Sequence, residues 1–167
     1  TQSTLPIFFT RWVTNFCAPA FSFLAGLSAF MVGKRKTPKE LSGFLFKRGV
    51  WLVFIEIAVI AFGWRFDINY TTIGLLTIWS LGVSMIVLAG LIHFPQKIIL
   101  AFSCILIFGH NLLDTIHFPG NILWSMLHER NRFEWIPGHY LGIAYPLIPW
   151  IAVMALGYYF GTFYNQS

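Results

Sequence analysis

Residues 12–33 contain no Asp, Glu, Lys or Arg, and this uncharged stretch limits the fold more than any other feature of the sequence. A helix that crosses the hydrocarbon core of a bilayer needs about 20 largely apolar residues, so we predict a spanning helix over residues 12–33. The whole chain is 57% hydrophobic and 10% charged, whereas a soluble domain is typically about 25% charged. We therefore expect an integral membrane protein whose main partner is the lipid bilayer.

Four further apolar stretches have the composition of spanning helices, and they lie near residues 49–64, 72–92, 98–116 and 145–163. The predicted fold class is all-α, a polytopic transmembrane helical bundle of about five spanning helices with one long external loop. Since the sequence shows no internal repeat, residues 1–167 are expected to form a single membrane domain. The chain has no initiating Met, and we expect it to be a piece of a longer polypeptide.

The basic residues are concentrated in one connection between the first two predicted helices. Six of the eleven lie there: Lys34, Arg35, Lys36, Lys39, Lys47 and Arg48. Short loops rich in Lys and Arg stay on the cytoplasmic side of a membrane. The pattern therefore predicts that loop 34–48 is cytoplasmic and that loop 117–143 is external. It orients the chain in a membrane and does not indicate a nucleic-acid partner.

Small residues recur at four-residue spacing along the first predicted helix. Ser22 and Gly26 form one such pair, and Ala25 and Ala29 form another. Small residues at this spacing let the backbones of two membrane helices approach closely. We interpret this pattern as a packing surface.

The same helix begins with polar residues in the stretch FFTRWVTNFCAPAFSFLAG, residues 8–26. In the predicted orientation Arg11 lies at the outer interface and Asn15 lies one turn deeper. Pro19 removes a backbone hydrogen bond and frees carbonyl groups near residue 15, which protein or water must satisfy. Two interpretations remain open. These residues form the lip of a buried polar cavity, or Arg11 reaches the lipid head groups and Asn15 bonds a neighbouring helix.

Glu56 is the charged residue inside the second predicted helix. At 1.5 Å per residue, it lies roughly 12 Å beyond Arg48 and so within the hydrocarbon region. A carboxyl group there should face protein or water, because exposure to lipid costs about 2.5–3.5 kcal/mol. It is a candidate proton acceptor, an anchor for another polar group, or a protonated carboxyl bonded to a neighbouring helix.

The stretch GHNLLDTIH, residues 109–117, carries a second polar group of residues. His110, Asp114 and His117 share one face of an α-helix because they are four and three residues apart. The face could bind a metal ion, or Asp114 could fix the tautomer of His110 and raise its basicity. Alternatively, the helix becomes polar simply because it reaches water. Pro119 ends the helix soon afterwards, and the prediction includes no assigned metal site.

Five motifs along the chain resemble a bacterial membrane family related to heparan-alpha-glucosaminide N-acetyltransferase. They are FFTRWVTNFCAPAFSFLAG, KRGVWLVFIEIAVI, WSLGVSMIVLAGLIHFP, FGHNLLD and YPLIPWIAVMALGYYFG. The resemblance implies an acyltransferase-like membrane protein, with acetyl-CoA as donor and a location in the bacterial cytoplasmic (inner) membrane. The lysosomal relative takes acetyl groups from acetyl-CoA on the cytosolic side and passes them to a glucosamine amine on the luminal side.

The resemblance has two departures that concern the site. The acetyl-accepting His of the lysosomal enzyme precedes the helix that matches residues 16–33, but Thr1 to Arg11 contain no His. Many bacterial relatives also carry His where this chain has Asn15. Composition and resemblance together favour six residues: His110, Asp114 and Glu56 are expected to be catalytic, and Arg11, Asn15 and Asn111 to bind substrate.

Three functions remain open from the sequence. In the first, His110 acts with Asp114 as a general base, and an acetyl group passes from acetyl-CoA to a sugar amine or hydroxyl. In the second, the chain is a structural or accessory subunit of a larger membrane assembly and has no activity of its own. A transporter comes third, since Glu56 could relay protons. Either a homodimer or other membrane subunits would fit these functions.

Overall fold

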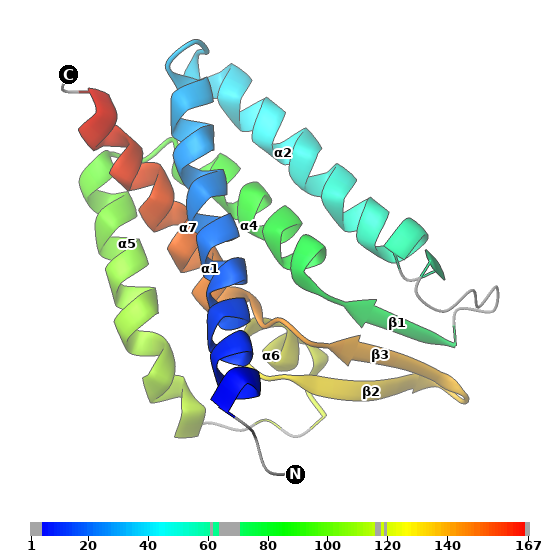
Figure 1. Ribbon diagram of the computed structural model, residues 1–167. Helices are drawn as coiled ribbons and strands as arrows, with labels where there is room; N and C mark the ends of the chain where they lie inside the picture. Colours follow the sequence, from blue (N-terminus) through cyan, green and yellow to red (C-terminus); the bar gives the residue numbers. More distant parts are fainter. Residues whose placement is uncertain (1–4, 61, 64–70, 116–117, 119, 166–167) are drawn as a thin grey trace.

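The computed structural model describes residues 5–60, 62–63, 71–115, 118 and 120–165. These residues form a bundle of helices with a small sheet at one end (Figure 1). The long helices are α1 (Leu5–Gly33), α2 (Pro38–Ile55), α4 (Thr77–Leu91), α5 (Gln96–Gly109) and α7 (Leu147–Phe160). A π-helical turn, Glu56–Ile60, follows α2, and 3₁₀ turns follow α5 and α7 at His110–Thr115 and Gly161–Asn165.

The described residues are mostly helical, as expected, but a three-stranded sheet corrects the all-α class. Its strands are β1 (Thr72–Leu75), β2 (Asn131–Ile136) and β3 (His139–Ile143), in the order β1-β3-β2. Strand β1 runs parallel to β3 with Thr72 opposite Tyr140, and β2 runs antiparallel to β3. We call this end of the bundle the sheet end. The opposite end, where the turn at residues 34–37 joins α1 to α2, is the basic end.

The segment predicted as the external loop 117–143 contains a short helix and a β-hairpin rather than an irregular loop. Helix α6 (Ile122–Leu127) is followed by the β2–β3 hairpin, whose turn contains Pro137 and Gly138. Gly138 has φ of 81°, which glycine adopts readily and which a type II turn requires after its proline. Oε1 of Glu134 accepts a hydrogen bond from the Gly138 N–H at 2.8 Å and stabilises the turn.

The helices also differ in extent from the predicted ones. Three are long and apolar enough to cross a membrane within the described residues: Phe16–Gly33, Gln96–Leu113 and Leu147–Tyr164. Helix α4 is apolar but shorter, because residues 72–75 join the sheet and leave the helix to begin at Thr77. Helix α2 begins at Pro38 rather than at residue 49, so most of the predicted loop 34–48 is helical.

The start of α2 is fixed by a reciprocal pair of hydrogen bonds between Thr37 and Glu40. Oγ1 of Thr37 accepts from the Glu40 N–H at 3.3 Å, and Oε2 of Glu40 accepts from the Thr37 N–H at 2.9 Å. This capping box satisfies amide donors that the first helical turn leaves without partners. The backbone hydrogen bond from Thr37 holds the pKa of the Glu40 carboxyl below its ordinary value.

We expect Thr37→Ala to lower stability by about 1 kcal/mol, because the helix loses its N-cap. Glu40→Gln tests the carboxylate separately. Since the folded pKa of Glu40 is lowered, its stabilisation is present at neutral pH and is lost as the pH falls through that folded value. Thermal unfolding in detergent at pH 7 and pH 3 measures both effects. The difference between wild type and Glu40→Gln should shrink at the lower pH, and a constant difference would contradict the assignment.

Two close helix contacts hold the bundle together. A side chain at Gly26 of α1 would collide with the Met154 carbonyl of α7, and one at Gly157 would collide with the Phe23 carbonyl. Gly49 of α2 and Gly82 of α4 lie against each other's carbonyl groups in the same way. The predicted packing surface on α1 is confirmed by these contacts and by the burial of Ser22, Gly26 and Ala29.

Candidate functional site

Glu56 opens the π-helical turn after α2 and is fully buried, with 0% of its surface exposed. Its Oε2 accepts a hydrogen bond from the Trp79 N–H at 3.0 Å. Trp79 lies in the first turn of α4, and Leu76, the residue before that helix, has no side chain able to cap it. Glu56 therefore caps α4 from another helix, where the positive end of the helix dipole favours a carboxyl oxygen.

The second oxygen of Glu56 has a different environment. Among the described residues, neither Oε1 of Glu56 nor Nε1 of Trp79 has a hydrogen-bond partner, although both atoms are buried. Unpartnered buried polar atoms are uncommon, because each costs the free energy of removing it from water. The start of α4 thus has an acceptor and a donor available to a further polar group.

We expect Glu56→Ala to destabilise the protein by about 1–3 kcal/mol, because the Trp79 N–H would be buried without an acceptor. Glu56→Gln keeps an acceptor oxygen at this position and should be close to wild type in thermal unfolding. Thermal unfolding in detergent measures both variants, and an unfolding temperature of Glu56→Ala equal to that of wild type would contradict the capping role.

His110 lies where α5 tightens into a 3₁₀ turn, and it is half-buried. Its Nδ1 is 2.8 Å from the carbonyl oxygen of Ile107. Because a carbonyl oxygen only accepts hydrogen bonds, Nδ1 must carry the proton and act as donor. In the neutral ring Nε2 then has a free electron pair, as a general base requires. The neighbouring Asn111 is exposed.

The predicted His110–Asp114–His117 face depended on an α-helix through residue 116. In a 3₁₀ helix residues three apart, rather than four, lie above one another, so the spacing argument does not apply to His110–Thr115. The side chain of Asp114 and the whole of His117 lie outside the described residues. Among the residues that are described, no group of three His, Cys, Asp or Glu side chains is placed to hold a metal ion.

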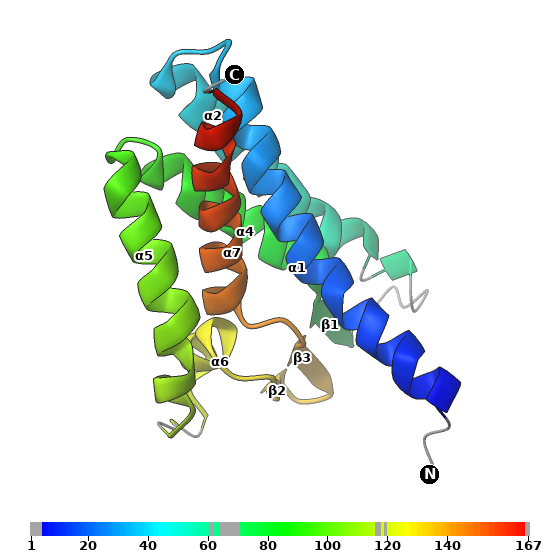
Figure 2. The same ribbon diagram turned by 60° about the vertical axis from the view of Figure 1, so that its left-hand side comes forward.

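Within the described part of the chain, no hydrogen bond joins one predicted site side chain to another. Arg11 and Asn15 belong to α1, but their side chains lie outside the described part of the chain. Figure 2 shows the N-terminal part of α1 projecting away from the sheet end of α5, where His110 follows. The end of α2, which leads to Glu56, lies on the other side of the bundle from α5 (Figure 1). Convergence of all six residues on one pocket stays a prediction.

A cavity at the sheet end was not predicted. It has a volume of about 220 Å³ and lies where β1, β2 and β3 meet the start of α4. Its lining residues include Thr72, Leu76, Asn131 and Arg132. The guanidinium of Arg132 lies 4.4 Å from the centre of the Tyr140 ring. The residues of β2 and β3 lie close together in the sequence, so a hairpin there could have been predicted. Thr72 joins them only through the pairing of β1 with β3, which the sequence does not reveal.

Apolar helices of spanning length, with many large apolar side chains exposed on them, define an integral membrane protein. It also carries two polar groups, the Glu56 carboxyl at the start of α4 and the half-buried His110 imidazole. Group-transfer enzymes use side chains of these types as acids and bases. The chain belongs to the family of heparan-alpha-glucosaminide N-acetyltransferase, catalytic, whose family model matches residues 1–167. The family resemblance of the five motifs is thereby confirmed, and an acetyltransferase-like protein is the class that it supports.

Neither the comparison with curated proteins nor that with solved structures gives a significant match.

Proposed function

We propose that this protein transfers an acetyl group from acetyl-CoA to the amine or hydroxyl of a sugar. The observation that carries the proposal is the match of the whole chain, residues 1–167, to the catalytic family. The free Nε2 of His110 supports it independently, because acyl transfer to an amine or hydroxyl needs a group that accepts a proton.

His110 is the proposed general base. Its Nε2 takes the proton from the acceptor amine or hydroxyl while the nucleophile forms its bond to the acetyl carbon. The carbon–sulfur bond of the thioester breaks, and the leaving CoA sulfur takes a proton in turn. The hydrogen bond from Nδ1 to Ile107 fixes the ring in the tautomer that this step needs. Asp114 is proposed to assist His110.

The acceptor is proposed to bind at the sheet end. The cavity beside Arg132 offers a guanidinium and the Asn131 amide to a polar molecule. Asn111 is exposed next to His110 and is a candidate acceptor ligand. Arg11 and Asn15 are proposed to bind the acceptor from α1. Glu56 is proposed to keep the start of α4 in place and to act on protons there.

The donor is proposed from the family. Acetyl-CoA supplies an activated acetyl thioester, and its phosphates require cationic side chains. Such side chains lie beside a cavity at both ends of the bundle, Arg35 and Lys36 at the basic end and Arg132 at the sheet end. Either end therefore has the positive charge that the phosphates of acetyl-CoA need, and charge alone does not show at which end the donor binds.

We further propose that the chain lies in a bacterial inner membrane with the basic end in the cytoplasm. The concentration of Lys and Arg in residues 34–48 supports this orientation. The sheet end, with residues 117–143, would then face outward, where an extracytoplasmic sugar could reach it.

The proposed activity is tested with purified protein in proteoliposomes, glucosamine and acetyl-CoA labelled in its acetyl group. Labelled N-acetylglucosamine and free CoA thiol should appear in equal amounts, and liposomes without protein provide the control. Absence of product over a panel of amino and neutral sugars would overturn the proposal. If a second protein then copurifies in fixed ratio and no CoA binds, the accessory-subunit alternative holds.

A further inference from the structure

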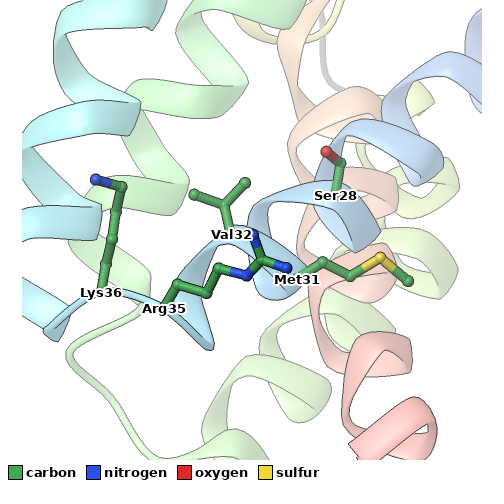
Figure 3. A pocket seen from close by; sticks show the side chains of 5 residues that line it. All are labelled: Ser28, Met31, Val32, Arg35 and Lys36. Carbon is green, nitrogen blue, oxygen red and sulfur yellow. The ribbon is translucent and has the colours of Figure 1, made fainter.

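A groove opens between α1 and α2 at the basic end. Helix α1 packs along α7, and α2 packs along α4, so the two helices diverge after the turn that joins them (Figure 1). A cavity of about 510 Å³ lies beside that turn, lined by Ser28, Met31, Val32, Arg35 and Lys36. This volume falls within the range of about 300–1,000 Å³ typical of ligand pockets. In Figure 3 Arg35 extends toward Met31, while Lys36 points toward α2.

A second, smaller cavity extends the first one into the bundle. It has a volume of about 110 Å³ and shares Ser28 and Val32 with the larger cavity. Its remaining lining residues come from α1, α2 and α4, and they are Ala25, Ala29, Phe44, Leu45, Arg48 and Met85. The two cavities together form one groove, with cations at its mouth and an apolar floor.

Arg35, Lys36 and Arg48 are the cations of the groove, and their positive charge can attract an anionic ligand. Lys36 and Arg48 both lie near the ring of Phe44, at 5.9 and 6.0 Å from its centre. The nearby carboxylate, Glu40, is held in the capping box by Thr37 and also interacts electrostatically with Lys36. Within the described ranges, Arg35 and Arg48 pair with no carboxylate. Lys34 differs, because its Nζ donates to the carbonyl of Tyr164 at 3.3 Å.

We propose that this groove binds an anionic phospholipid. The phosphate would lie between Arg35, Lys36 and Arg48, and one acyl chain would follow the apolar floor between α1 and α2. Basic pockets between membrane helices favour such head groups. Both walls continue into exposed apolar side chains, among them Met31 at 46% and Trp51 at 59%, so an acyl chain can leave the groove into the bilayer.

The floor distinguishes a lipid from the other phosphate-bearing candidate, CoA. The arm of CoA contains amide groups, which need hydrogen-bond partners when they are buried. Among the residues that line the smaller cavity, Ser28 contributes a hydroxyl and Arg48 a guanidinium, and the other side chains are apolar: Ala25, Ala29, Val32, Phe44, Leu45 and Met85. An acyl chain leaves no polar group unpaired on such a surface. This inference does not depend on the proposed acetyl transfer.

Native mass spectrometry of the purified protein tests the proposal. Phosphatidylglycerol and phosphatidylcholine with identical acyl chains are titrated separately, and the bound lipid is counted. We expect phosphatidylglycerol to bind more tightly. Arg35→Gln/Arg48→Gln should weaken its binding by roughly 25-fold, at about fivefold for each cation removed. Lys39→Gln/Lys47→Gln removes the same charge from exposed positions outside both cavities and should have little effect.

A further variant tests the floor of the groove. Ser28 is exposed and lines both cavities, so Ser28→Phe fills them without a change in charge and should also reduce lipid binding. Equal binding of the two lipids, equal losses in the two double variants, or unchanged binding by Ser28→Phe would each overturn the proposal. Displacement of phosphatidylglycerol by CoA or by inorganic phosphate at micromolar concentration would instead assign the groove to a soluble phosphate compound.

Discussion

Replacing His110 by alanine is expected to lower the kcat/KM of acetyl transfer by about 10²–10⁴-fold, the usual contribution of a positioned general base. The imidazole is held by the hydrogen bond from Nδ1 to the Ile107 carbonyl, so its Nε2 has a defined direction and tautomer. Alanine removes the base but leaves the helix around it able to form. The measurement is the initial rate of labelled acetyl transfer in proteoliposomes, with thermal unfolding measured in parallel.

The matched control for this variant is His93→Ala. His93 is exposed in the turn that follows α4, at the basic end of the bundle, so its loss should leave transfer unchanged. If His110→Ala retains wild-type rates, or if both variants lose activity equally, His110 is not the base. If His110→Ala fails to fold, His110→Asn retains a side-chain hydrogen-bond donor and tests the same point.

The largest expected effect on stability belongs to Gly157→Leu. A side chain at this position would meet the backbone carbonyl of Phe23, and a backbone atom in a packed helix cannot move aside as a side chain can. Helices α1 and α7 would have to separate, which also disturbs the contact at Gly26. We expect a loss of about 3 kcal/mol, the upper part of the range for overpacked cores.

Gly90→Leu provides the comparison for this variant. Gly90 also lies in a helix, α4, but it is exposed, and an added side chain would meet nothing within 4 Å. Thermal unfolding in the same detergent should show a large decrease for Gly157→Leu and no decrease for Gly90→Leu. Similar unfolding temperatures for the two variants would show that the α1–α7 contact is looser than described.

The sequence predicts the helices better than it predicts the sheet, and the reason is physical. A long uncharged segment in a bilayer must satisfy its own backbone hydrogen bonds, and a helix does so. Helices near residues 12–33, 98–116 and 145–163 are therefore expected from composition alone. The sheet depends on pairing β1 with β3 across a long separation in sequence. A single short strand such as Thr72–Leu75 carries too little periodicity to reveal that pairing. The early start of α2 was obscured by its many basic residues.

For the candidate site, the sequence predicted the burial of Glu56 but not the hydrogen bonds that the site residues make. The burial of Glu56 follows from its position in an apolar stretch and is confirmed, because lipid cannot satisfy a carboxyl group. Its partner, the Trp79 N–H, requires knowledge of where α4 begins. The role of His110 stays a prediction, and its hydrogen bond to Ile107, near the change to a 3₁₀ turn, was not predicted. The pairing of Arg132 with Tyr140 depends on the hairpin register.

The most direct test of the proposed function uses sealed proteoliposomes in which the orientation of the protein is known. Glucosamine is supplied on the side of the sheet end, and labelled acetyl-CoA is supplied on the side of the basic end in one arrangement and on the side of the sheet end in the other. The proposed function predicts that wild-type protein forms labelled N-acetylglucosamine on the sheet-end side and that His110→Ala forms almost none. Absence of product from wild type with the two compounds in either arrangement, or equal product from both proteins, would contradict it.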